Sequence, residues 1–148
     1  MSASGIVLSD EVLETFKKLN NDRLYSAIGL KLDDAMTKII VDESLTMDHV
    51  DADAFEAAWG EYIDKLPDNE PRFIVADWAY IEKADNAPKE KTVHIFWCPE
   101  GCKIRLKTVS STSMAVVHET LNISVHTRAD DDDTISYEGI CHIMPKNK

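Results

Sequence analysis

Two runs of this sequence carry apolar side chains on what would be both faces of a β-strand. They are Arg72 to Tyr80 and Val93 to Trp97. A strand that is apolar on both faces has to be covered on both sides, which is typical of central strands. Such strands need helices packed against each face of their sheet. The sequence therefore predicts a mixed sheet between two helical layers.

Capping residues, apolar spacing and prolines predict the remaining elements. In the first half of the chain, we expect a helix from the Ser9 cap to Asn20, strands at Tyr25–Leu32 and Thr37–Val41, and a helix from Phe55 to Leu66. A loop is expected from Asp85 to Pro88, followed by a long helix from Pro99 to about Asn122. The chain should then form a strand at Ile123–His126, an acidic loop at Ala129–Asp133, and a short last helix through Ile140, Ile143 and Met144. On the long helix, the predicted core-facing stripe is Val109, Ser113, Val116, Val117 and Thr120. The fold class is α/β (α+β), in the order α-β-β-α-β-β-α-β-α. One domain is expected over residues 1–148, with a flexible N-terminal tail (1–8) and a short C-terminal tail (145–148).

The length, net charge and cysteine content limit the classes of partner and the cellular setting that suit this chain. The 148 residues suit one domain, and the net charge of −11 disfavours nucleic acid and anionic membrane surfaces. The three cysteines do not suggest a disulfide framework, and the sequence has neither a signal peptide nor an apolar run of membrane-spanning length. We therefore expect a cytoplasmic monomer without disulfides.

Metal and catalytic sites find little support in the sequence. His94, Cys98 and Cys102 are spaced like ligands, but a fourth zinc ligand could come only from the distant Cys141 or His142. The acidic run 130–133 lacks the alternating ligands of a calcium loop. There is no phosphate-binding glycine loop and no nucleophile elbow. We expect no metal, no cofactor and no enzymatic activity.

Basic residues are few but clustered. Lys103, Arg105 and Lys107 alternate within five positions, and Lys89 and Lys91 precede the strand predicted at 93–97. In an acidic chain, such a cluster is suited to contact an acidic protein surface.

Several short motifs occur in a fixed order along nearly the whole chain. They are Ser4-Gly5-Ile6 with Leu8-Ser9-Asp10-Glu11, Leu66-Pro67 with Arg72 to Tyr80 (similar to "LP…RYAVYDFEY"), Phe96 to Glu100 (similar to "WSPD"), and Ser136-Tyr137-Glu138 (similar to "SYE"). Their order and spacing resemble the ADF/cofilin family. The resemblance implies an ADF-homology domain that binds actin monomers and filaments and promotes filament severing and depolymerisation in the cytoskeleton.

The resemblance also implies which residues bind. Gly5, Ile6 and the long helix, with Met114 and His118, would enter the cleft between two actin subdomains, while Arg105 and Lys107 would grip the monomer. Lys89 and Lys91 would contact the filament side. Ser4 matches a serine that is phosphorylated in many members, where the added charge would repel an acidic surface. Phosphoinositides would compete weakly for Lys103, Arg105 and Lys107.

The sequence departs from the family at two helices. Met114, Ala115, His118 and Glu119 stand where family members carry mostly basic residues, and the last helix (140–144) lacks the usual charged pair. The departure in the last helix predicts filament binding that is weaker than monomer binding. The alternative that stays open is the same fold on another partner, as in the glia maturation factor branch, which binds the Arp2/3 complex.

Overall fold

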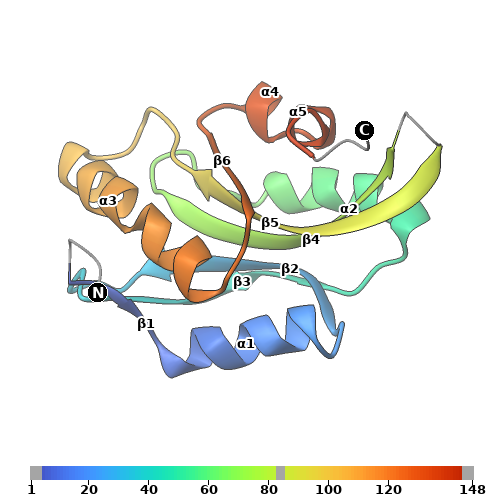
Figure 1. Ribbon diagram of the computed structural model, residues 1–148. Helices are drawn as coiled ribbons and strands as arrows, with labels where there is room; N and C mark the ends of the chain where they lie inside the picture. The colour runs from blue at the N-terminus through green and yellow to red at the C-terminus, as the bar shows by residue number, and fades with distance from the viewer. Residues whose placement is uncertain (1–4, 83–85, 145–148) are drawn as a thin grey trace.

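The computed structural model describes residues 5–82 and 86–144 and places both two-sided apolar runs inside a mixed β-sheet (Figure 1). Within these residues, six strands lie in the order β1-β3-β2-β4-β5-β6. The β1/β3 and β5/β6 pairs are parallel, and the other neighbours are antiparallel.

The helices cover the sheet on both sides. The elements of the described residues are β1 (Val7–Leu8), α1 (Asp10–Asn20), β2 (Tyr25–Leu32), β3 (Lys38–Asp48), α2 (Ala52–Ile63), β4 (Arg72–Glu82), β5 (Ala87–Trp97), α3 (Ile104–Thr120), β6 (Val125–Ala129), α4 (Asp132–Ile135) and α5 (Tyr137–Cys141). Helices α1 and α3 lie on one face of the sheet and α2, α4 and α5 lie on the other (Figure 1).

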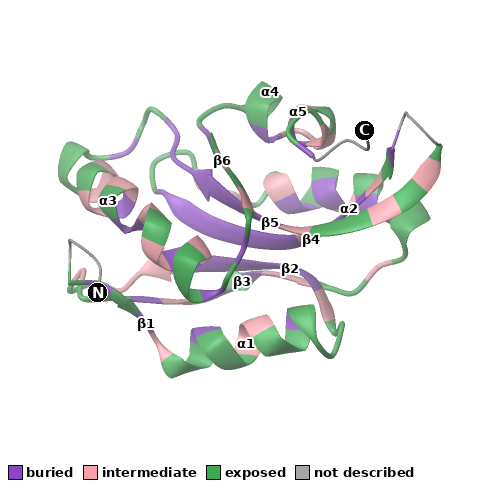
Figure 2. Ribbon diagram, in the orientation of Figure 1, coloured by how far each residue is buried: buried purple, intermediate pink, exposed green. Residues whose placement is uncertain are grey.

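Side-chain alternation along β4 divides the core in two. Phe73 and Val75 join the cluster under α1 and α3, whereas Ile74, Ala76 and Trp78 join the cluster under α2 and α5. Both clusters are buried, while the outer surfaces of the helices are exposed (Figure 2). The predicted central strands and the layered mixed sheet are therefore confirmed.

Tryptophan side chains connect distant segments on the α2 side. The indole Nε1 of Trp59 donates to the carbonyl of Ile135 at 2.8 Å, and that of Trp97 donates to the carbonyl of Pro67 at 2.8 Å. Because each indole N–H has an acceptor, these rings fill the core without leaving a buried donor unpaired.

Residues 6–8 of the predicted flexible tail lie against the sheet, whereas residues 1–4 and the predicted C-terminal tail at 145–148 lie outside the described residues. Residues 7 and 8 pair with Lys38 and Ile39 of β3, and Ile6 is only 3% exposed. Ile6 and Leu8 both join the core under α1 and α3, which fixes this segment against the sheet. A two-residue strand is too short to show a periodic pattern in the sequence.

Strands β3 and β5 are longer than predicted. β3 continues past Val41 to Asp48 because these residues pair with β2, and Asp42 is buried in an ion pair with Arg72, whose Nε lies 2.9 Å from the Asp42 Oδ2. β5 begins at Ala87 rather than Val93, since its outer half pairs with the outer half of β4. Lys89 and Lys91 therefore lie within a strand, and the loop predicted at 85–88 is mostly strand; residue 85 itself lies outside the described residues.

The C-terminal third follows the predicted order with shifted boundaries. α3 starts only at Ile104, because the amide of Cys102 bonds to the carbonyl of Pro99 in a turn. β6 begins at Val125, two residues later than expected. The predicted acidic loop contains the start of α4, which Asp131 caps by accepting from the amide of Thr134 at 2.7 Å.

The described helices do not include one with the length and apolar character needed to cross a membrane.

Candidate functional site

The first turn of α3 concentrates positive charge on the surface. Its N-cap is Lys103, which makes no side-chain capping bond, and the turn carries no acidic residue. Arg105 is exposed and Lys107 is half-buried. Cations near a helix N-terminus oppose the helix dipole, so their position here weakens the helix slightly. A local positive potential on a chain of net charge −11 is suited to an acidic partner.

An isoleucine accompanies these cations. Ile104 is 83% exposed, the highest value among the large hydrophobic side chains of the described residues that lie at the surface. An exposed apolar side chain beside cations is a common composition of binding surfaces. The sequence reasoning above missed Ile104, although its place between Lys103 and Arg105 was visible.

The inner face of α3 is lined by small residues. Ser110, Ser113 and Val117 are buried against the sheet, and the Ser113 hydroxyl donates to the carbonyl of Val109 at 2.7 Å. The predicted stripe was right for Ser113 and Val117 and wrong for Thr120, which is exposed. Small side chains let the helix axis lie close to the strands, which is why α3 packs directly against β1 and β5.

The N-terminal segment and α3 meet at one edge of the sheet. Ile6 and Leu8 share a core cluster with Val117 and Met114. Gly5 is exposed and adopts φ +75°, a left-handed conformation that favours glycine. The structure places Ile6 in the same core cluster as residues of the long helix, and it buries the Ile6 side chain there. Ser4 lies outside the described residues.

Met114 and His118 are half-buried on α3. The Nδ1 atoms of His118 and His94 lie 3.1 Å apart, and the ring of His118 stacks on that of His126 with centroids at 3.8 Å. Burial lowers the pKa of His94 to about 3, helped by His118 and His126. Burial and His126 likewise lower the pKa of His118.

The candidate zinc ligands do not form a site. Among the described residues there is no cluster of three or more His, Cys, Asp or Glu side chains arranged to hold a metal ion. Cys98 and Cys102 are both buried as free thiols, and burial together with Cys98 raises the pKa of Cys102 to about 11. A thiol with such a pKa is a poor metal ligand near neutral pH.

Lys89 and Lys91 lie on the outer half of β5, opposite Tyr80 and Trp78 of β4. This half of the β4–β5 pair extends beyond the rest of the sheet (Figure 1). Between the two lysines, Glu90 accepts from Arg23 Nη2 at 2.6 Å, which connects the ribbon to the end of α1.

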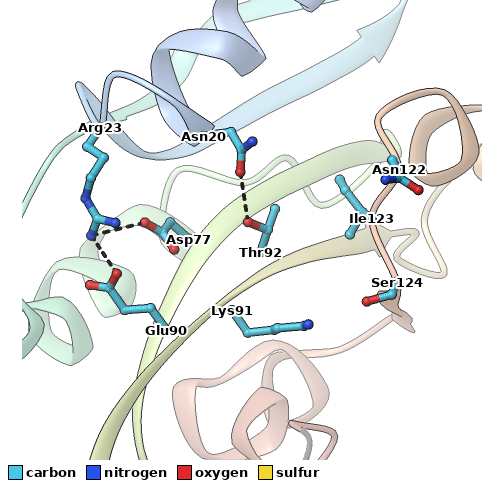
Figure 3. A pocket seen from close by; sticks show the side chains of 9 residues that line it. All are labelled: Asn20, Arg23, Asp77, Glu90, Lys91, Thr92, Asn122, Ile123 and Ser124. Atoms are coloured by element: carbon cyan, nitrogen blue, oxygen red, sulfur yellow. Dashed lines mark hydrogen bonds and ion pairs between the residues drawn. The ribbon is translucent and has the colours of Figure 1, made fainter.

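A polar cleft of about 360 Å³ lies beside this connection. Figure 3 shows Arg23 reaching towards Asp77 and Glu90, and the Arg23 Nη2 lies 3.5 Å from Asp77 Oδ2. Burial, followed by the charge of Glu90, raises the pKa of Asp77. The residues lining the cleft are Asn20, Arg23, Asp77, Glu90, Lys91, Thr92, Asn122, Ile123 and Ser124.

The last helix is built on the Ser136-Tyr137-Glu138 motif. Ser136 caps α5 by accepting from the amide of Gly139 at 3.0 Å, and the Tyr137 hydroxyl donates to the carbonyl of Ala79 at 2.8 Å. A Cβ at Gly139 would lie 2.4 Å from the carbonyl oxygen of Asp133, so this position requires glycine. The motif therefore fixes α5 on the sheet and leaves Glu138 exposed.

A family model described as cofilin/tropomyosin-type actin-binding protein matches residues 5–142. The chain belongs to this family. This cofilin-type chain is 31% identical over 141 residues to a cofilin of Ogataea parapolymorpha, covering 95% of this chain and 92% of that protein. Proteins named actophorin and actin-depolymerizing factor 3, from Entamoeba histolytica and Zea mays, also match over 93% of the chain.

Solved structures agree with the cofilin-type fold. The crystal structure of a cofilin from Streptomyces griseoflavus superposes with a TM-score of 0.75 at 25% identity, covering 93% of this chain and 96% of that one. Actin depolymerization factor 2 of Plasmodium berghei gives a TM-score of 0.80 at 22% identity, with 95% and 96% covered. The predicted ADF-homology domain is therefore confirmed.

Proposed function

We propose that this chain binds actin monomers and filaments, promotes filament disassembly in the cytoplasm, and has no enzymatic activity. Family membership supports actin as the partner. The observation that carries the site is the first turn of α3, where Arg105 and Ile104 are exposed on a helix that also packs against β1.

The proposed monomer site combines charge and an apolar strip. Arg105 and Lys107 would meet acidic groups of actin while Ile104 and the exposed face of α3 enter a groove, a common mode of helix recognition. Gly5 would lie in the contact, with Ile6 holding it in place from the core. Met114 and His118 are half-buried, so they act at least partly by positioning α3. A phosphate on Ser4 would place negative charge beside an acidic partner and weaken binding.

The proposed filament contact is the extended β4–β5 ribbon, through Lys89 and Lys91. If this chain binds one conformation of the actin subunit more tightly, it would shift the filament towards that conformation. Disassembly would follow because that conformation is the less stable one in the polymer. Around α5, Glu138 and His142 are exposed, and no lysine or arginine lies within residues 137–144. We therefore expect filament binding to be weaker than monomer binding.

Co-sedimentation with actin filaments tests this function. Wild type should pellet with filaments or move actin to the supernatant. Arg105→Ala/Lys107→Ala should lower the affinity by about 2 kcal/mol, or roughly 30-fold, since close charge pairs at interfaces contribute on this scale. The matched control is Lys17→Ala/Lys18→Ala, which removes the same charge from the exposed face of α1.

The outcomes separate the alternatives. Equal loss in both double variants would show that net charge, not the α3 site, governs binding. A rise of actin in the supernatant without co-pelleting would identify a protein that chiefly binds monomers. If wild type has no effect on actin, the proposal is wrong, and debranching of Arp2/3-nucleated filaments becomes the assay to perform.

A further inference from the structure

Three histidines from three separate elements form one contiguous column. His94 comes from β5, His118 from α3 and His126 from β6. The His94 and His118 rings have centroids 5.4 Å apart and Nδ1 atoms 3.1 Å apart, and the His118 and His126 rings are parallel at 3.8 Å. The column therefore joins the C-terminal half of the long helix to two neighbouring strands.

At the inner end of this column, an additional proton on the His94–His118 pair would leave a buried N–H without an acceptor. His94 is fully buried, and its Nε2 has no hydrogen-bond partner among the described residues. In the neutral pair, one Nδ1–H donates to the other Nδ1, and both tautomeric assignments satisfy that contact. If His118 becomes protonated, its Nδ1–H must donate to His94, which forces the proton of His94 onto the buried, unpartnered Nε2. Such an orphan N–H is costly.

The other end of the column opposes protonation as well. A charged His118 would lie directly against the parallel ring of His126, so that both rings cannot become cations without repulsion. On the same strand, Arg128 places a permanent cation at the β6–α3 contact, since its Nη1 lies 3.4 Å from Ser111 Oγ. On α3 itself, Glu119 is the neighbouring anion, and it favours a charged His118. From β4, the column is faced by the uncharged ring of Phe73, 6.1 Å from His94.

We propose that His94, His118 and His126 form a clasp that holds the C-terminal half of α3 on the sheet only while the rings are neutral. Mild acid would then loosen this half of the helix without unfolding the sheet. Because α3 carries the proposed actin site, the effect on actin rests on the proposed function. The clasp itself can be tested without actin.

The first experiment measures the free wild-type protein. An NMR pH titration of the imidazole signals from pH 8 to 5 should show His94 neutral throughout and the pKa of His118 below the ordinary value of a histidine. Amide hydrogen exchange, corrected for the intrinsic rate, should show residues 116–121 opening about tenfold more often at pH 5.5 than at pH 7.5. This factor follows if opening returns the buried His94 to an ordinary pKa near 6.5. Protonation of His94 within this pH range, or exchange in residues 116–121 that does not change with pH, would overturn the proposal.

A variant pair separates the clasp from general acid sensitivity. His94→Phe places an apolar ring beside Phe73 and Phe96 and should remove most of the tenfold pH effect, whereas the exposed-site control His49→Gln should retain it. Equal pH effects in both variants would contradict the clasp. If His94→Phe does not fold, the wild-type titration and exchange decide the question alone.

The actin measurement compares monomer affinity of wild type and His94→Phe at pH 7.5 and 5.5, so that the pH response of actin cancels in the ratio. We expect the monomer affinity of His94→Phe, divided by that of wild type, to rise several-fold from pH 7.5 to pH 5.5. A constant ratio together with pH-dependent exchange would uphold the clasp and refute its link to actin. Absence of actin binding at both pH values would refute the proposed function, while the exchange data would still judge the clasp.

Discussion

Replacing Trp97 tests the packing at the end of the central strand β5, on the face of the sheet that α2 covers. Trp97 is the last residue of β5; it pairs with Arg72 and Ala129 on either side and is 5% exposed. Truncation to Ala removes a buried bicyclic ring and should lower the free energy of unfolding by about 3–5 kcal/mol. That loss is a large part of the ~5–15 kcal/mol that stabilises a typical domain.

A second substitution separates packing from hydrogen bonding at the same position. Trp97→Phe keeps an aromatic ring but removes the Nε1 donor, which leaves the carbonyl of Pro67 without this partner. A hydrogen bond of this part-buried kind contributes about 0.5–1.5 kcal/mol, so this variant should lie between wild type and Trp97→Ala. The order of the three proteins is therefore a prediction of its own.

Urea unfolding followed by far-UV circular dichroism measures these differences without depending on tryptophan fluorescence. The matched control is Ile81→Ala on β4, because this large apolar side chain is 57% exposed and its loss should change stability by less than about 0.5 kcal/mol. A loss below about 1 kcal/mol for Trp97→Ala, or equal losses for Trp97→Ala and Ile81→Ala, would refute the placement of Trp97 in the core.

Two further predictions concern buried polar groups. The Tyr62 hydroxyl is buried without a hydrogen-bond partner among the described residues, and burial raises its pKa. Tyr62→Phe should therefore leave the free energy of unfolding in urea unchanged or raise it by up to about 1 kcal/mol. A loss of more than about 1 kcal/mol would reveal an unrecognised partner of the hydroxyl. The folded-state pKa of His94 is about 3, below its unfolded value near 6.5, so its stabilising effect is complete above pH 6.5 and is lost as the pH falls towards 3. Between pH 7 and 5.5 this amounts to about 1 kcal/mol, and urea midpoints of His94→Phe should show a correspondingly flatter pH dependence than wild type.

The sequence predicts the centre of the fold better than its edges, for a physical reason. The central strands are buried on both faces, so their apolar residues leave no ambiguity at Phe73–Trp78 or Val93–Trp97. The outer half of β5 pairs only with the outer half of β4 and is largely solvated, which explains why its lysines gave no strand signal. β1 is two residues long, and no period can appear over two residues.

The residues around the candidate site were likewise only partly predictable from the sequence. The basic residues of α3 could be found from sequence because Lys103, Arg105 and Lys107 are close neighbours in the chain. The histidine column could not, since His94, His118 and His126 belong to three elements that meet only after the sheet and α3 have packed together. Likewise, the buried pair of Arg72 and Asp42 joins residues 30 positions apart.

The sheet separates two cores that have few residues in common. Val75 and Phe96 face α1 and α3, while Ile74 and Ile95 face α2, α4 and α5. Substitutions at distant sites without shared partners have nearly additive effects on stability. A destabilising change beneath α3 can therefore be offset by better packing beneath α2, with little disturbance of the proposed binding surface. The two faces of this domain are thus free to vary independently, so that changes in stability on the α2 side need not alter the proposed recognition surface on the α3 side.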